Sequence, residues 1–352
     1  MADERVESAV ANWGPRFIAN GIDYNDFVRT TASISRWEEW IDAWSSTAEM
    51  HRELAQQALS VGHSRSAGEA FARAAVSYHF AKFVWVVDLE RNHAATEAAA
   101  ASLYEAHALL DPTAERVRAP LDGGDVVGNL RLPPGADAPV PLVLLLPGLD
   151  STKEEFFSLE SVFLSRGMAT LSLDGPGQGE TGFHSHIRSD YEVAVTAALD
   201  ALAGRRELDL GRVGAAGMSL GGYYAVRAAA FEPRLKAIAG VSGPYDMSAA
   251  WETKPALTRE AFACYSGASD DREARERAAQ LNLAGVAEIV EQPCLVVTGK
   301  RDRVIQWEDT KRIADEAPNG EWMLYEEATH VCNNVPFKYR PLIADWLRDR
   351  LG

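Results

Sequence analysis

The sequence predicts an α/β fold, a doubly wound and mostly parallel sheet, preceded by an all-helical N-terminal domain. The early part of the chain has helical periodicity and almost no glycine or proline after Gly21. From about Arg116 onward, short apolar runs alternate with amphipathic stretches, the order that strands and helices take in such folds. Asp111-Pro112 stands between the two patterns, and proline cannot continue a helix. We therefore predict two domains, residues 1–112 and 113–352.

The first domain is predicted to be a small group of helices. Four apolar residues recur at three- and four-residue spacing in segment 35–61, and so share one helix face: Trp37, Trp40, Ile41 and Trp44. After the break at Gly62, two more helices are predicted at about 67–90 and 94–110. The pair resembles a helical-repeat hairpin, but no second copy recurs at a fixed period. We expect a compact helical domain, not a solenoid.

The second domain is predicted to build the sheet. Apolar, β-branched runs predict strands at 140–146, 169–173, 213–216, 237–241 and 294–298. Amphipathic stretches predict helices at 154–165, 191–203, 220–231, 307–316 and 339–350. In sheets of this kind ligands bind at the carboxyl ends of the strands. Functional residues are therefore expected in the segments that directly follow strands.

Composition limits the partners. The chain has 51 acidic and 35 basic residues and a net charge of −16, which disfavours nucleic acid and anionic membranes. The three cysteines are few and scattered, so neither a disulfide framework nor a metal cluster is expected. No cofactor motif stands out. We expect a small-molecule substrate, with no metal and no cofactor.

No targeting or membrane segment is expected. The N-terminus, MADERVESAV, has neither a basic region nor an apolar core of the signal-peptide type. The densest apolar run, residues 140–146, is far too short to cross a bilayer. We expect a cytoplasmic protein that does not bind membranes.

A serine between a strand and a helix is the strongest functional signal. Ser219 lies in Gly217-Met218-Ser219-Leu220-Gly221, after the run 213–216 and before the helical stretch 220–231. A nucleophilic serine on a tight turn needs glycines two residues away on each side. The following helix N-terminus favours developing negative charge. The pattern predicts a nucleophile elbow, with a glycine-rich structural turn as the alternative.

A serine nucleophile needs a base and an acid that orients the base, and in such folds they follow the serine in the order acid, then histidine. Asp302 comes just after the strand 294–298, and His330 lies between a strand-like segment, 322–325, and the last helix. Both positions fit a triad with Ser219.

Other residues compete for these roles. Asp246 also follows a strand and is the alternative acid. His184 and His186 lie in a loop that could approach the site, but they precede the serine. Five further histidines fall in the helical domain, where surface or core roles are expected: His51, His63, His79, His93 and His107.

Two backbone amides are predicted to stabilise the oxyanion. One is the N–H of Leu220, directly after the serine, and the other is placed at Leu149 in the loop after strand 140–146. The segment from Asp174 to Gly179, DGPGQG, lacks both the lysine of a P-loop and the spacing of a dinucleotide fingerprint. We interpret it as a structural turn at the border of the site.

Three segments carry a resemblance to a known group: GLDSTKEE at 148–155, RGMAT at 166–170 and DGPGQGE at 174–180. In the helical domain NGIDY at 20–24, WEEW at 37–40 and AWS at 43–45 contribute further. Together they resemble the 2,6-dihydroxypseudooxynicotine hydrolase-like α/β-hydrolases, a group with an N-terminal helical domain that includes fungal polyketide-shortening hydrolases. The resemblance covers nearly the whole chain.

The resemblance implies hydrolysis of a carbon–carbon bond next to a ketone, on an aromatic or polyketide-like substrate. Its triad carries over onto Ser219, Asp302 and His330. It also implies an acid that assists the carbon leaving group, for which Glu252 is the nearest match; the alternative for Glu252 is an ordinary surface glutamate. The group's helical domain covers the active site and contributes to a dimer, so a lid and a homodimer are expected here.

Two other functions stay open. The same triad serves a carboxylesterase, lactonase or thioesterase, because fold and nucleophile do not choose the leaving group. A catalytically silent hydrolase fold that acts as a binding protein is the third possibility.

Overall fold

The chain consists of two compact units, and the computed structural model describes residues 3–136 and 138–352. The helical unit comprises Met1–Ala114 and Glu154–Ser158, and the sheet unit comprises Glu115–Lys153 and Leu159–Gly352. The division after Ala114 lies near the boundary drawn from the sequence. The grouping of Glu154–Ser158 with the helices was not anticipated.

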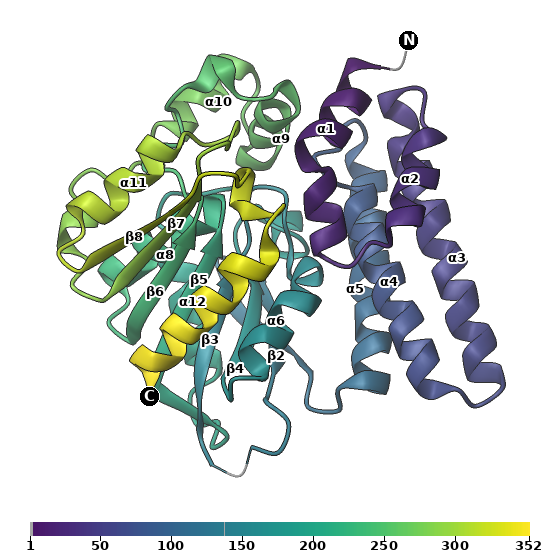
Figure 1. Ribbon diagram of the computed structural model, residues 1–352, viewed down its shortest axis with the longest axis horizontal. Helices are drawn as coiled ribbons and strands as arrows, with labels where there is room; N and C mark the ends of the chain where they lie inside the picture. Colours follow the sequence, from purple (N-terminus) through teal and green to yellow (C-terminus); the bar gives the residue numbers. More distant parts are fainter. Residues whose placement is uncertain (1–2, 137) are drawn as a thin grey trace. The chain divides into compact units, whose positions relative to one another are not determined.

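The helical unit is built from helices that follow one another along the chain (Figure 1). They are α1 (Glu4–Ala19), α2 (Tyr24–Ala32), the 3₁₀ helix η1 (Trp37–Glu39), α3 (Trp40–Ser60), α4 (Ser64–Ala81) and α5 (Leu89–Leu110). The prediction of one helix over 67–90 was wrong at its end. Val84 has a φ of 41°, outside the helical region, and Asp88 starts α5 by accepting a hydrogen bond from the Arg91 amide.

Aromatic side chains form the core of the helical unit. Trp40 and Trp44 are fully buried, and Trp37 and Ile41 nearly so, which confirms the apolar face predicted for this segment. The Trp40 indole N–H donates to the Phe80 carbonyl at 2.9 Å. A buried indole therefore keeps its hydrogen bond while its ring fills the core.

A buried ion pair ties Glu155 into the helical unit. The Arg16 guanidinium donates to both carboxylate oxygens, at 2.6 and 2.7 Å, and Asn20 Nδ2 donates to Oε1 at 2.6 Å. His79 Nε2 lies 3.2 Å from Oε2. Burial alone would raise the pKa of Glu155, but Arg16 holds it well below its ordinary value. The carboxylate is therefore charged and satisfied inside the unit.

The sheet unit contains one sheet with the strand order β1-β2-β4-β3-β5-β6-β7-β8. β2 pairs antiparallel with β1 and with β4, and the remaining neighbours are parallel. The strands are β1 (Glu115–Leu121), β2 (Gly124–Arg131), β3 (Val140–Leu146), β4 (Ala169–Asp174), β5 (Leu208–Met218), β6 (Leu235–Val241), β7 (Cys294–Gly299) and β8 (Gly320–Tyr325).

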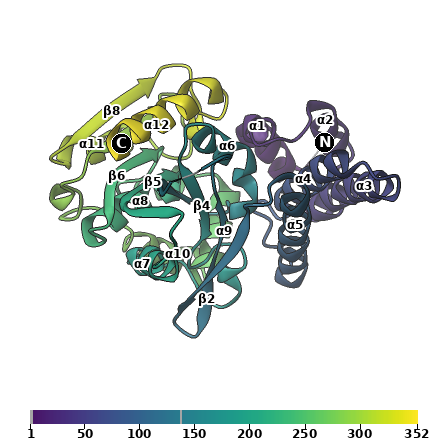
Figure 2. The ribbon, with the colours of Figure 1, turned by 90° about the horizontal axis from the view of Figure 1, so that it is seen from below.

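Helices cover both faces of this sheet. α6 (Phe157–Leu164) and α12 (Pro336–Leu351) lie over one face, and α7 (Glu192–Ala201) and α8 (Leu220–Phe231) lie over the other (Figures 1 and 2). The remaining α-helices of the described sheet unit are α9 (Ala256–Ser266), α10 (Asp271–Ala278) and α11 (Trp307–Glu316). The helices predicted at 220–231 and 307–316 have the bounds observed.

The sequence missed β1, β2, α9 and α10. β1 is an edge strand with charged residues on its exposed positions and Pro120 near its end, a composition that edge strands tolerate and that hides the apolar signal. By contrast β4 and β7 are buried at every residue, and parallel strands of this kind are recognisable as apolar runs. Among the described residues, no helix has the length and apolar character needed to cross a membrane.

Candidate active site

Ser219 lies on a sharp turn between β5 and α8. Its φ of 56° and ψ of −125° fall outside the regions that a residue with a side chain ordinarily adopts. The Ser219 amide donates to the Val241 carbonyl of β6 at 2.8 Å. Strain of this kind persists only where the surrounding structure holds it. The predicted elbow conformation is present.

The two glycines of the elbow are explained by backbone contacts. A Cβ on Gly217 would lie 1.9 Å from the Gly221 carbonyl oxygen, and a Cβ on Gly221 would lie 2.0 Å from the Leu146 oxygen. Neither space admits a methyl group. The strand, the turn and the first turn of α8 approach one another at a distance that only glycine permits.

A chain of hydrogen bonds joins Asp302, His330 and Ser219. His330 Nδ1 lies 2.7 Å from Asp302 Oδ2, and His330 Nε2 lies 2.9 Å from Ser219 Oγ. The Asp302 side chain is fully buried and that of His330 is 10% exposed. This is the geometry in which a histidine can accept the serine proton while a carboxylate fixes its ring. The structure thus brings together the three side chains selected from the sequence.

Local turns hold the two loop residues. Asp302 Oδ1 accepts hydrogen bonds from the amides of Val304 and Ile305, at 2.8 and 2.9 Å, so only Oδ2 remains for the histidine. On the other loop, Val331 takes a φ of 54° and donates its amide to Ser242 Oγ at 3.1 Å. The turn after β7 therefore orients the acid, and the end of β6 anchors the residue after the base.

The competing residues have other partners. Asp246 accepts from the Ser248 amide and hydroxyl, at 2.8 and 2.6 Å, and from Asn282 Nδ2 at 2.9 Å. A Cβ on Gly267 would lie 3.0 Å from the His186 ring, and one on Gly124 would lie 3.3 Å from His184 Cβ. Asp246, His184 and His186 thus lie against other segments of the chain, whereas Asp302 is the carboxylate that lies next to His330.

The loop after β3, residues 147–149, runs against the serine. A Cβ on Gly148 would lie 3.1 Å from Ser219 Cβ and 3.6 Å from its Oγ. Leu149 is buried, and Leu220 is the first residue of α8. In the described part of the chain, neither the Leu149 nor the Leu220 amide donates to a protein acceptor. Leu220 directly follows Ser219 and Leu149 directly follows Gly148, and the oxyanion role of their amides stays a prediction.

Glu252 is not joined to this chain of hydrogen bonds. It lies in the short helix η4 (Trp251–Thr253), its side chain is 66% exposed, and its carboxylate accepts from Arg275 Nη1 at 2.6 Å. The geometry gives this residue the contacts of a surface glutamate. Its proposed catalytic role rests on the resemblance alone.

Lys254, two residues further, was not singled out from the sequence. It is 6% exposed, and its Nζ donates a long hydrogen bond of 3.4 Å to the Val304 carbonyl, in the turn that holds Asp302. Burial lowers the pKa of Lys254, while the nearby carboxylates Asp309, Asp302 and Asp246 act in the opposite direction. No sequence pattern points to this lysine, because the residues around its side chain come from a distant loop.

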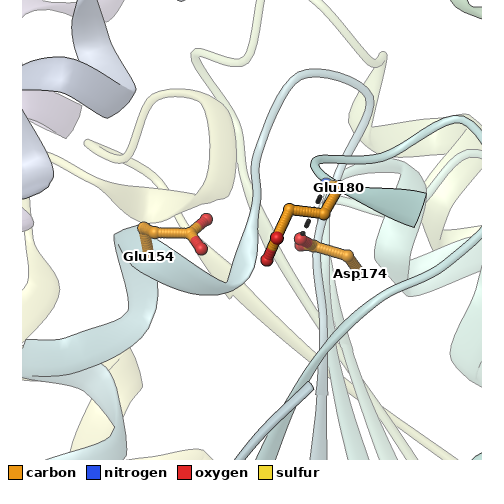
Figure 3. A group of neighbouring side chains, drawn as sticks. All are labelled: Glu154, Asp174 and Glu180. Atoms are coloured by element: carbon orange, nitrogen blue, oxygen red, sulfur yellow. Dashed lines mark hydrogen bonds between the residues drawn. The ribbon is translucent and has the colours of Figure 1, made fainter. Parts of the chain in front are cut away.

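Asp174 and Glu180, at the two ends of the turn after β4, form the second group that the sequence missed. Lys153 Nζ lies 2.7 Å from a carboxylate oxygen of each. The Glu180 amide donates to Asp174 at 3.4 Å (Figure 3). The Asp174 carboxylate is buried and that of Glu180 is 14% exposed, and carboxylate oxygens suit a divalent cation. Since the Lys153 ammonium already lies between them, we assign this group a structural role.

Comparison with known proteins places these features in a family. The profile described as esterase FrsA-like matches residues 23–351. 2,6-Dihydropseudooxynicotine hydrolase of Paenarthrobacter nicotinovorans is 35% identical over 352 residues, covering 99% of this chain and 94% of the relative. The crystal structure of 2,6-dihydroxy-pseudo-oxynicotine hydrolase matches with a TM-score of 0.87 and 34% identity, covering 97% of this chain and 96% of the other. The fold class and the resemblance predicted from the sequence are confirmed.

A fungal relative matches in part. The 20-hydroxy-prefusarin hydrolase of Gibberella moniliformis (strain M3125 / FGSC 7600) is 37% identical over 227 residues. The match covers 60% of this chain, and the chain spans about half the length of that relative, 53%.

Proposed function

The chain belongs to the FrsA-like esterase family of α/β-hydrolases, and from this we propose that it is a serine hydrolase that works through an acyl-enzyme. One observation carries the proposal: the hydrogen-bond chain from Asp302 through His330 to Ser219 Oγ, at 2.7 and 2.9 Å. The strained elbow supports it, because such a conformation is held where it serves a function.

In the proposed first step, Ser219 Oγ attacks a carbonyl carbon and His330 Nε2 accepts the hydroxyl proton. Asp302 bonds to Nδ1–H and stabilises the imidazolium that forms. The negative charge moves to the carbonyl oxygen, which accepts hydrogen bonds from the Leu220 and Leu149 amides. The intermediate then collapses, the leaving group departs, and the imidazolium supplies its proton. Water, activated by the same histidine, releases the acyl group and restores the serine.

We infer that the bond cleaved is a carbon–carbon bond next to a ketone, in an aromatic or polyketide-like substrate. The support is similarity over nearly the full length to a 2,6-dihydropseudooxynicotine hydrolase and partial similarity to a fungal hydrolase. A carbon leaving group must depart as an aryl- or enol-stabilised carbanion and needs a proton. We propose that the His330 imidazolium gives this proton, and Glu252 is the alternative donor that the resemblance suggests.

A carboxylesterase, lactonase or thioesterase is the second candidate, favoured by the description of the matching family as an esterase. A series of aryl ketones and 1,3-diketones, each compared with the ester of the same acyl group, separates the two. Faster turnover of the ketone at equal concentration supports carbon–carbon cleavage. Turnover of the ester alone assigns the site to an esterase.

The nucleophile is tested with purified Ser219→Ala and a fluorophosphonate probe. The wild type is expected to be labelled and to hydrolyse p-nitrophenyl esters, while Ser219→Ala is neither labelled nor active above background. Ser165→Ala, in an exposed position, is the matched control and keeps both properties. Labelling that persists in Ser219→Ala would remove the serine from its proposed role, and an unlabelled wild type would favour the non-catalytic binding protein.

A homodimer formed through the helical domain, residues 1–112, and a cytoplasmic location are also proposals. The dimer follows from the resemblance, and the location from three scattered cysteines that are all free thiols. Light scattering of the purified protein measures the mass directly. A mass of one chain, 38.4 kDa, would contradict the dimer.

A further inference from the structure

Gln178 lies in the turn after β4 and is 2% exposed. Its Nε2 donates to the Pro147 carbonyl at 2.7 Å and to the Gly148 carbonyl at 2.8 Å. Its Oε1 accepts from the Gly175 amide at 2.9 Å and from the Tyr191 hydroxyl at 3.0 Å. A primary amide has two N–H donors and an oxygen that accepts two bonds, so every hydrogen-bonding site of this side chain is used.

The orientation of this amide is fixed by its partners. The Gly175 backbone N–H can only donate, and the carbonyls of Pro147 and Gly148 can only accept. Exchanging the oxygen and nitrogen of Gln178 would set donor against donor and acceptor against acceptor. The Gln178 amide group therefore has one defined orientation, in which its NH₂ donates to two successive carbonyls of the 147–149 loop.

The hydrogen bond from Gln178 to the Gly148 carbonyl also sets the direction of the Leu149 N–H. A trans peptide is planar, so the C=O of Gly148 and the N–H of Leu149 point in opposite directions from one bond. When the carbonyl is held by Gln178, the N–H is directed away from Gln178. Gly148 itself lies against the serine, with its Cβ position 3.6 Å from Ser219 Oγ.

The loop needs such an external restraint. It contains a glycine, the residue with the greatest backbone freedom, and it lies outside β3 and η2 (Lys153–Phe156), so no ladder or helical hydrogen bond holds it. A donor that stabilises a transition state must already be in position when charge develops, because reorganisation during the reaction costs rate.

We propose that Gln178 is a positioning residue, which holds the 147–149 loop so that the Leu149 amide faces the oxyanion formed at Ser219. The inference rests on the proposed serine-hydrolase function and adds a residue to it. The polar groups that act on the substrate are the backbone amides. Gln178 works through them and does not touch the substrate.

The first test is Gln178→Met, which keeps the length of the side chain and removes both donated bonds. Since the Leu149 amide stays in the chain but is no longer held, we expect kcat/KM for a p-nitrophenyl ester to fall by about 10- to 100-fold, less than for outright removal of an oxyanion donor. The inhibition constant of phenyl trifluoromethyl ketone, which forms a charged adduct with the serine, rises in parallel. 1-Phenylethanol, which has no carbonyl for the serine to attack, is expected to bind within about twofold of wild type.

Thr181→Val is the matched control for loss of a buried polar group in the same turn. Thr181 donates to the Asp174 carbonyl at 2.8 Å and accepts from the Val127 amide at 3.1 Å, away from the 147–149 loop. It should lower the melting temperature and leave kcat/KM within about twofold. If Gln178→Met behaves like this control, with full activity when folded, Gln178 is only structural and the inference is overturned.

Gln178→Glu tests the same point should the methionine variant not fold. An ionised carboxylate can still accept from Gly175 and Tyr191 but cannot donate to the two carbonyls, whereas the protonated acid can donate to one of them. The ratio of variant to wild-type kcat/KM is therefore expected to rise as the pH falls. A ratio that stays constant with pH contradicts the inference. If the wild type itself neither reacts with the fluorophosphonate nor cleaves the ester, it is the proposed function that fails, and not this step.

Discussion

Gly217 lies so close to Gly221 that a methyl group on the first would meet the carbonyl oxygen of the second at 1.9 Å. Both atoms belong to the turn that carries Ser219, so relief of this clash must move the turn. We expect Gly217→Ala to lower the free energy of unfolding by about 3 kcal/mol or more, the upper range for overpacking against a rigid neighbour. Any folded fraction should also lose esterase activity.

Gly211→Ala is the control on the same strand. Gly211 is exposed, and its added Cβ would lie 3.1 Å from a carboxylate oxygen of Asp209, which is the end of a side chain and not backbone. Urea unfolding followed by tryptophan fluorescence compares the two variants. Equal stability of Gly217→Ala and Gly211→Ala would show that the elbow tolerates a side chain at position 217.

Asp302→Asn is expected to reduce kcat strongly at unchanged fold. The amide keeps the shape of the acid but no longer stabilises the imidazolium and can turn its NH₂ toward Nδ1, so we expect a loss of about 10³- to 10⁴-fold. Kinetics with a p-nitrophenyl ester at pH 7 to 8 measure it. Asp246→Asn is the matched control, because Asp246 bonds to Ser248 and Asn282. A larger loss for Asp246→Asn would assign the acid to that residue.

The pattern of local sequence explains why these three side chains could be selected in advance. The elbow is a strand, a turn and a helix within about twenty residues, and Asp302 and His330 each follow a strand. The carboxyl ends of parallel strands meet at one edge of a sheet. The order of the strands along the chain was therefore enough to predict that the three side chains lie close together.

Contacts between distant segments could not be selected in this way. Gln178 bonds to carbonyls 31 and 30 residues earlier, and Lys153 bonds to Asp174, 21 residues later. Both residues lie in segments that carry the family resemblance, but nothing in the local pattern shows which distant group each side chain bonds to. The antiparallel strands β1 and β2 were missed for the same reason, since the pairing of β1 with β2 and of β2 with β4 is decided by the partner strands and not by their own periodicity.

His79 is expected to make stability depend on pH. Burial lowers the pKa of this fully buried imidazole from its ordinary 6.5, and Lys82 and Arg16 act in the same direction, while Glu155 opposes them. Below pH 6.5 the unfolded chain takes up a proton that the folded chain refuses, so stability falls as the pH falls. One proton corresponds to at most about 1.4 kcal/mol per pH unit.

The window from pH 6.5 down to 4.5 separates this effect from that of Glu155, whose lowered pKa acts mainly below its ordinary 4.5. His79→Gln keeps an N–H near Glu155 and cannot titrate. Urea titrations at several pH values measure its unfolding free energy. Compared with wild type, we expect this free energy to be lower at pH 7 and to change less with pH across the window. His63→Gln, at an exposed position, should keep the wild-type slope. An unchanged slope for His79→Gln would contradict the assignment.

Glu252→Gln decides whether this residue assists a carbon leaving group. Because the carboxylate is exposed and paired with Arg275, we expect the variant to hydrolyse both an aryl ketone and its matching ester within about twofold of wild type, as a surface pair contributes little. Arg275→Gln breaks the same pair from the other side and should behave alike. If Glu252→Gln, and not Arg275→Gln, lost ketone cleavage but kept ester hydrolysis, Glu252 would be assigned the role of assisting the leaving group.

Lys153→Met is expected to destabilise the sheet unit severely. Lys153, with a side chain 2% exposed, neutralises Asp174, which is fully buried, and Glu180, which is 14% exposed. Removing the ammonium leaves two carboxylates together in a buried site, and breaking such a pair from one side costs about 3–5 kcal/mol.

Lys300→Met breaks an exposed pair with Glu326 and should change the unfolding free energy by under about 1 kcal/mol. Urea unfolding at pH 7 measures both. Recovery of Lys153→Met by millimolar Mg²⁺ would show that the carboxylates can accept a metal, and an equal effect of the two substitutions would mean that the buried pair contributes no more than a surface one.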